Sequence, residues 1–123
     1  MKIILDTHIF LWALSEPGKL STKRLTELKS LSNSVYVSAV TITELMIKDS
    51  IGKLKVNFDP VELAEKSGFD LLDFKATDAL LLKELPFYHK DPFDRMLICQ
   101  AIEHGLTIAT ADRIMRSYPV RMI

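Results

Sequence analysis

Short apolar runs alternate with helix-length segments along the chain, and this alternation constrains the fold more than any other feature. The first run, KIIL at residues 2–5, is apolar without a break, which is typical of a strand buried on both faces. Further strands are expected at 35–37, 69–74, 106–110 and 120–123. The alternation predicts an α/β protein with three α/β/α layers around a mostly parallel central sheet.

The segments between these runs carry helix start and stop signals. Asp59–Pro60 and Asp91–Pro92 pair a capping side chain with a residue suited to the first helical turn, and Gly68 and Gly105 suit helix ends. The expected helices span residues 7–14, 21–32, 38–52, 59–68, 76–85, 91–105 and 111–118. Right-handed crossovers should connect the strands.

Composition narrows the class of protein further. The 123 residues suit one domain, 1–123, and 16 basic residues balance 16 acidic ones, so global charge gives no sign of nucleic acid. Cys99 is the single cysteine, and no signal peptide or membrane span is expected, which suits a reducing cytoplasm. The 48% hydrophobic content suggests that a partner covers some apolar surface.

Asp94 stands out within the stretch HKDPFDRMLICQA. On a helical wheel it lies in the middle of the apolar face formed by Phe93, Leu97 and Ile98 with their neighbours, whereas Arg95 falls on the opposite side. An ionised carboxylate in that place costs several kcal/mol unless a backbone cap, a cation or a metal pairs with it.

Three further acidic residues are expected near Asp94, at the carboxyl ends of the strands. Asp6 ends the first strand, Glu44 opens the helix after the second, and Asp112 follows the strand at 106–110. Each has a structural alternative: Asp6 and Asp112 as helix caps, and Glu44 in a capping box from Thr41 or in a pair with Lys48. Four converging carboxylates nevertheless need counter-charge, and Mg²⁺ or Mn²⁺ supplies it through oxygen ligands.

Other motifs give little support for other chemistry. No GxGxxG, P-loop, GxSxG or HExxH pattern occurs. His8, His89 and His104 are scattered and are expected to be structural, and nothing indicates an activated thiol. Thr7 and Thr110 adjoin the carboxylates and are expected to bond them or a metal-bound water.

The stretches LDTHIFLWAL, VSAVTITELMIK with GKL after it, HKDPFDRMLICQA and LTIATADR resemble PIN-domain toxins of the VapC type, across essentially the whole chain and in the family's order. The resemblance implies a PIN-like fold and a Mg²⁺- or Mn²⁺-dependent ribonuclease with metal and catalytic residues at Asp6, Glu44, Asp94 and Asp112. Thr110 matches a small hydroxyl residue of that cluster. Asp91 is read first as a cap and second as an outer ligand. Thr43 departs from the tryptophan often found there.

The same resemblance implies a homodimer, a small cognate antitoxin and hydrolysis of RNA phosphodiester bonds that inhibits translation. Either Glu44 or Asp112 would accept the proton of the attacking water. The RNA backbone would need cations at the rim, and the candidates are Lys48, Lys53, Lys55, Arg95, Arg113 and Arg116.

Two other functions stay open at this level. A PIN-like module without catalysis would bind RNA and leave it intact, although all four acids are present. A phospho-receiver domain would need an aspartate after the third strand, which Asp73 could supply, and a lysine after the last strand, which the terminal VRMI does not provide.

Overall fold

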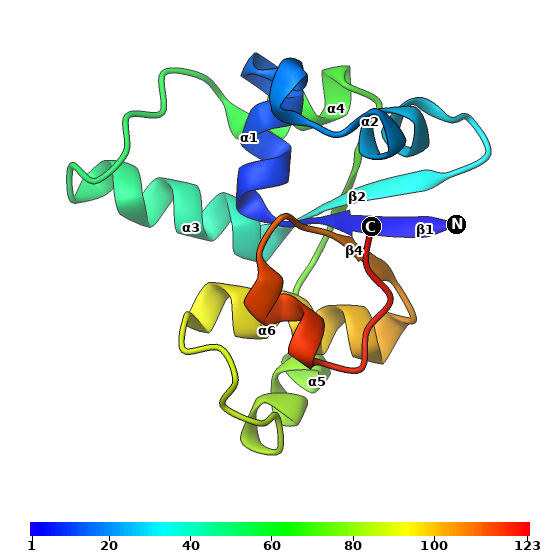
Figure 1. Cartoon of the computed structure of the whole chain (residues 1–123). Helices are drawn as coiled ribbons and strands as arrows, with labels where there is room; N and C mark the ends of the chain where they lie inside the picture. Colours follow the sequence, from blue (N-terminus) through cyan, green and yellow to red (C-terminus); the bar gives the residue numbers. More distant parts are fainter.

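Four parallel strands form the centre of the molecule (Figure 1). The computed structural model describes residues 1–123, and its sheet has the order β3-β2-β1-β4. The strands are β1 (Lys2–Leu5), β2 (Ser34–Ser38), β3 (Asp70–Leu72) and β4 (Thr107–Ala109). Every strand pairing is parallel, which confirms the α/β class and the parallel sheet.

Helices cover both faces of this sheet. The α-helices are α1 (Thr7–Ser15), α2 (Thr22–Lys29), α3 (Ala39–Ser50), α4 (Pro60–Lys66), α5 (Ala76–Ala79) and α6 (Pro92–His104). Shorter 3₁₀ turns are η1 (Pro17–Lys19), η2 (Leu80–Lys83) and η3 (Arg113–Ser117). Helices α1, α2 and α4 lie on one side of the sheet and α5 and α6 on the other, so the three-layer prediction is confirmed (Figure 1). No helix has the length and apolar character that a bilayer crossing requires.

Burial on both faces explains the unbroken apolar character of the first strand. Ile3 and Leu5 belong to a core with Phe10 of α1, whereas Ile4 belongs to a second core with Leu97 of α6. All of these side chains are fully buried. The alternation of side chains along β1 therefore holds the two helical layers to opposite faces of one sheet.

Three predicted elements differ from the structure. Residues 76–85 form a short α-helix and then a 3₁₀ turn; Pro86 has no N–H for the carbonyl of Leu82, which accepts a bond from Arg95, as does the carbonyl of Leu85. Residues 111–118 yield only the 3₁₀ turn η3. The last segment makes one isolated parallel bridge, Ile108 to Met122, and three backbone hydrogen bonds join it to the segment 108–110.

The strand order places a crevice beside Asp6. From β1 the chain moves to β2 and β3 on one side, and β4 adds to the other side of β1. The helix that leaves β1, α1, and the helix that leads into β4, α6, lie on opposite faces (Figure 1), so the carboxyl ends of β1 and β4 border the crevice where α/β proteins bind ligands.

Candidate active site

Asp6 lies at the carboxyl end of β1 and is 5% exposed. Its Oδ1 accepts a bond from the backbone N–H of Ile9 at 2.8 Å, so it caps α1. Its Oδ2 accepts a 2.5 Å bond from the hydroxyl of Thr110. Burial raises the pKa of this carboxyl, and the bonds from Thr110 and Ile9 offset part of the rise.

Thr110 connects the ends of β1 and β4. Its hydroxyl donates to Asp6 and accepts the backbone N–H of Asp112 at 3.0 Å. Asp112 in turn caps η3, because its Oδ1 accepts the N–H of Ile114 at 2.9 Å. The structural alternative of capping therefore holds for Asp6 and Asp112, and each still has a second carboxylate oxygen toward the other site residues.

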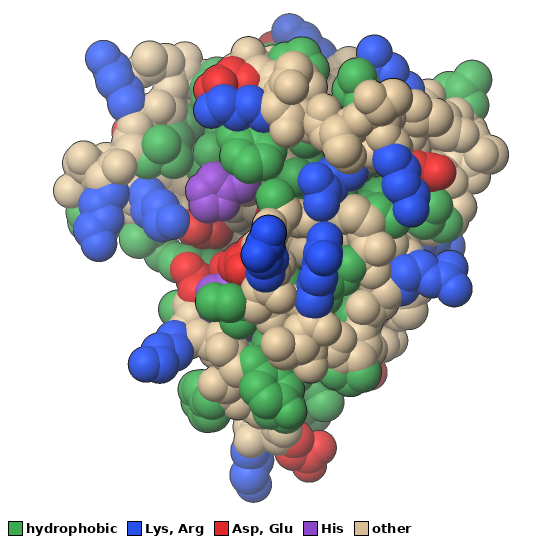
Figure 2. Space-filling model, viewed as in Figure 1, with side chains coloured by type: hydrophobic (Ala, Val, Ile, Leu, Met, Phe, Trp, Pro, Cys, Tyr) green, Lys and Arg blue, Asp and Glu red, His purple; other side chains and the backbone are tan.

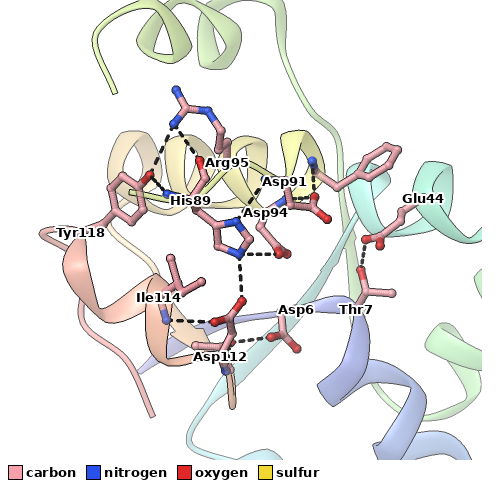
Figure 3. A network of polar contacts seen from close by, with 12 residues as sticks. Asp6, Thr7, Glu44, His89, Asp91, Asp94, Arg95, Asp112, Ile114 and Tyr118 are labelled. Carbon is pink, nitrogen blue, oxygen red and sulfur yellow. Dashed lines mark hydrogen bonds and ion pairs between the residues drawn. The ribbon is translucent and has the colours of Figure 1, made fainter. Parts of the chain in front are cut away.

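The two aspartates of the α6 start differ as the sequence predicts. Asp91 is the cap, with its Oδ1 accepting the N–H groups of Phe93 at 2.8 Å and Asp94 at 3.1 Å. The Asp94 side chain instead turns into the crevice (Figure 3). Burial, and after it the charge of Asp91, raises the pKa of Asp94 to about 7. The charges of Asp6 and Glu44 also raise this pKa, and His89 lowers it.

His89 lies between two of the carboxylates, although the sequence alone favours a structural role. Its Nε2 is 3.0 Å from Oδ2 of Asp94 and 2.8 Å from Oδ2 of Asp112. Its Nδ1 accepts the backbone N–H of Asp91 at 3.1 Å. A neutral ring that accepts at Nδ1 carries its proton on Nε2, so His89 donates toward the carboxylates. The sequence signal that could have identified His89 as a site residue is its position two residues before Asp91, in the stretch HKDPFDRMLICQA.

Glu44 reaches the crevice from α3 and is 4% exposed. The hydroxyl of Thr7 donates to its Oε1 at 2.6 Å, and Lys48 donates to its Oε2 at 2.5 Å. Ser38 caps α3, so the capping box from Thr41 is wrong and the Lys48 pair is confirmed. The bond to Glu44 raises the pKa of Lys48, and the charges of Asp91 and Asp94 contribute, which locates this ammonium at the acidic crevice.

Arg95 does not lie at a solvent-exposed rim, so its predicted contact with RNA is wrong. The residue is 5% exposed, and its guanidinium donates to the carbonyls of Pro86, Leu85 and His89 at 2.9, 3.0 and 3.3 Å. It also lies 3.8 Å from the ring centre of Phe87. The segment before α6 covers the helix side that the wheel identifies as polar. The remaining candidate cations Lys53, Lys55, Arg113 and Arg116 are exposed.

The acidic cluster formed by Asp6, Glu44, Asp94 and Asp112 carries more negative charge than the neighbouring cations of the protein neutralise. Figure 2 shows the acidic side chains gathered in a hollow, with basic side chains around it. Ligand atoms of His89, Asp94 and Asp112 lie within 4.8 Å of one another. Since the His89 Nε2 carries a proton, carboxylate oxygens are the donors left for a cation. This oxygen-rich donor set fits Mg²⁺ or Mn²⁺.

The fold and site define a class of protein with a parallel sheet and carboxylates converging at its carboxyl edge. The PIN domain family model matches residues 3–120, and the chain belongs to this family. It is 23% identical over 119 residues to Ribonuclease VapC22 of Mycobacterium tuberculosis, covering 94% of this chain and 91% of that protein.

Solved structures share the fold. In VapBC2 from Rickettsia felis bound to a promoter DNA fragment, the matching chain is 20% identical with a TM-score of 0.75, and the match covers 100% of this chain and 98% of that one. In DNA-bound VapBC from Salmonella typhimurium it is 21% identical with a TM-score of 0.68, and the match covers 100% and 97%. The PIN-like architecture predicted from the sequence is therefore confirmed.

Proposed function

We propose that this protein is a Mg²⁺- or Mn²⁺-dependent endoribonuclease that acts as the toxin of a toxin–antitoxin pair. The observation that carries the proposal is the convergence of buried Asp6 with partly buried Asp94 and Asp112, in which Asp94 has a pKa raised to about 7. Such a cluster is unfavourable in the protein alone and favourable around a divalent cation. The ribonuclease relative and the VapBC structures support the same function.

Asp6, Asp94 and Asp112 would hold the metal, with Glu44 as the fourth acidic residue. The bound ion would supply an activated water and stabilise charge developing on the scissile phosphate. The protein's own residues set the geometry: the Thr110 hydroxyl holds Asp6, and the His89 N–H holds Asp94 and Asp112. His89 is thus a positioning residue and not a metal ligand.

Either Glu44 or Asp112 would accept the proton of the attacking water. Glu44 accepts hydrogen bonds from Thr7 and Lys48. Asp112 has an N–H donor on one oxygen and His89 on the other. Lys48, Lys53 and Arg113 are proposed to contact the RNA backbone, with Lys55 and Arg116 as further candidates, whereas Arg95 holds the segment before α6.

The proposed partners are a small antitoxin and a second copy of the chain, and the proposed location is the cytoplasm. The similarity of this chain to a chain of the two-component VapBC structures supports the antitoxin. A groove of about 440 Å³ beside α2 offers an apolar lining that includes Leu25, Leu28 and Phe69. An antitoxin helix fits such a groove through apolar anchors. RNA cleavage would then inhibit translation once the antitoxin is lost.

The test is cleavage of a mixed RNA pool by the whole protein with Mg²⁺, with Mn²⁺ and with a chelator. We expect cleavage with either metal, none with the chelator, and none from Asp94→Asn with metal. Intact RNA bound by the wild-type protein in the presence of metal would instead identify a PIN-like binding module without catalysis.

A further inference from the structure

A basic cavity adjoins the acidic site on the side of α2 and η3. It has a volume of about 430 Å³. Its lining consists of three cations, Lys23, Arg24 and Arg116, together with Ser21, Val120, Met122 and Ile123. No acidic side chain lines it. The charge of this cavity is therefore opposite to that of the neighbouring carboxylate cluster.

Arg24 of the cavity is linked to the carboxylates by hydrogen bonds through one residue, Thr110. Its Nη2 donates to the carbonyl oxygen of Thr110 at 2.7 Å, and the hydroxyl of Thr110 donates to Asp6. The Nε of Arg24 is buried and has no hydrogen-bond partner. Lys23 and Arg116 are exposed and form no ion pair, since the ion pairs of the structure involve other residues. Lys23 and Arg116 thus offer cationic groups that have no ion-pair partner within the protein.

We propose that this cavity binds the RNA backbone beside the bond that is cleaved, with a neighbouring phosphate on Lys23, Arg24 and Arg116. The inference rests on the proposed function, because a scissile phosphate at the carboxylates requires the adjoining phosphate to leave the acidic hollow. Cations at the next position stabilise that path electrostatically. The apolar side of the cavity, Val120 and Met122, then lies against sugar or base.

The arrangement divides the basic residues into two groups. Lys48 is already paired with Glu44 at the opposite wall of the crevice. Lys23 and Arg116 lie beyond Thr110, are exposed and are free to meet an anion. RNA extending from the carboxylates in this direction gains phosphate contacts that are electrostatic and independent of sequence.

The experiment measures binding of a fluorescent ten-nucleotide single-stranded RNA to the Asp94→Asn protein, which should leave the RNA intact. The double variant Lys23→Ala/Arg116→Ala is compared with Lys66→Ala/Lys83→Ala, which removes the same charge from exposed sites on α4 and η2. We expect the cavity variant to bind more weakly and to lose about 0.7 of salt-dependence slope per lost phosphate contact. The control pair should keep the parent affinity and slope.

Equal weakening by both pairs, or no weakening by the cavity pair, overturns the inference. A second measurement needs no cavity substitution: RNA should protect Lys23 from acetylation and leave Lys66 reactive, and protection of neither overturns the inference too. Protection of Lys23 only by an acidic peptide would assign the cavity to a protein partner and also overturn it. Metal-dependent cleavage by the wild-type protein is scored separately, so failure of the cavity and failure of the ribonuclease proposal remain distinguishable.

Discussion

Two aspartate–histidine contacts lie at opposite ends of α6, and they differ in charge balance. At the far end, Asp78 is fully buried, with one oxygen 2.8 Å from Nε2 of His104 and the other accepting the N–H of Lys75 at 2.9 Å. Each oxygen has one donor, and no other carboxylate joins. At the near end, the single imidazole of His89 is shared by Asp94 and Asp112.

The difference separates a structural contact from a candidate ligand site. The Asp78 pair is satisfied within the protein and fixes α5 to α6. The His89 cluster keeps surplus negative charge, because Asp6, Glu44 and Asp91 also act on Asp94. The same residue types thus serve stability where donors match acceptors, and form the proposed metal site where acceptors exceed donors.

Substitution of Asp94 should give the largest effect. Asp94→Asn should reduce RNA cleavage to background and abolish the metal-induced rise in Tm, because it removes a proposed metal ligand. For the wild-type protein, metal at a hundred times its Kd should add about 2.7 kcal/mol to the free energy of unfolding. Asp78→Asn is the matched control and should keep both responses. Equal metal-induced shifts in wild type and Asp94→Asn would remove Asp94 from the site.

The pH dependence of stability should sharpen the same contrast. The pKa of Asp94 in the folded protein, about 7, exceeds its ordinary value of 3.8. The folded state therefore binds the proton more tightly, and the stability due to it is lost as pH rises through 7. In chelator, the free energy of unfolding of Asp94→Asn minus that of the wild type, measured by denaturant titration, should grow from pH 5 to pH 8 by an amount on the order of a few kcal/mol at most. A difference that stays constant would contradict the raised pKa.

His89 should tune metal affinity without being a ligand. His89→Ala should weaken Mg²⁺, Mn²⁺ and Co²⁺ binding by a common factor of about 10–100, because the carboxylates lose their positioning donor. His89→Gln, which retains an N–H donor, should recover part of the loss, and His104→Ala should leave metal affinity unchanged. Titration calorimetry measures all three. A loss confined to Co²⁺, which favours nitrogen ligands, would make His89 a direct ligand.

Disruption of the structural pair should affect only stability. Asp78→Ala leaves the Lys75 N–H and the His104 ring without their buried acceptor, at a cost of about 1–3 kcal/mol in the free energy of unfolding. Metal affinity and cleavage, measured below the melting transition, should match the wild type. Loss of metal response in a folded Asp78→Ala protein would erase the distinction between the two ends of α6.

Most of the fold and the positions of the acidic residues could be predicted from the sequence, because strand patterns and helix caps are local signals. The run at residues 2–5 predicts a doubly buried strand, and Asp91–Pro92 predicts the start of α6 to the residue. In a parallel sheet, strand ends meet at one edge, so Asp6 and Asp112 could be expected together.

The sequence could not show which other segment of the chain packs over a given face of a helix. The wheel places Arg95 away from the apolar face of α6, yet it is buried, because the segment around Pro86 and Phe87 packs over that side. Cys99 of the same helix is also fully buried. Burial there raises the pKa of the Cys99 thiol, which agrees with the absence of an activated cysteine. The role of His89 likewise depends on Asp112, which is distant in sequence and close only after folding.

The smallest effect should come from Asp91, the cap beside the site. Asp91→Ala removes the acceptor of two first-turn N–H groups and should cost about 0.5–2 kcal/mol of stability. The N–H that fixes the His89 ring belongs to the backbone of Asp91 and survives the substitution. Cleavage below the melting transition should therefore fall far less than in Asp94→Ala, in parallel assays of the two proteins. Equal loss of activity in a well-folded Asp91→Ala protein would place Asp91 among the metal-binding residues and leave α6 without a division between cap and ligand.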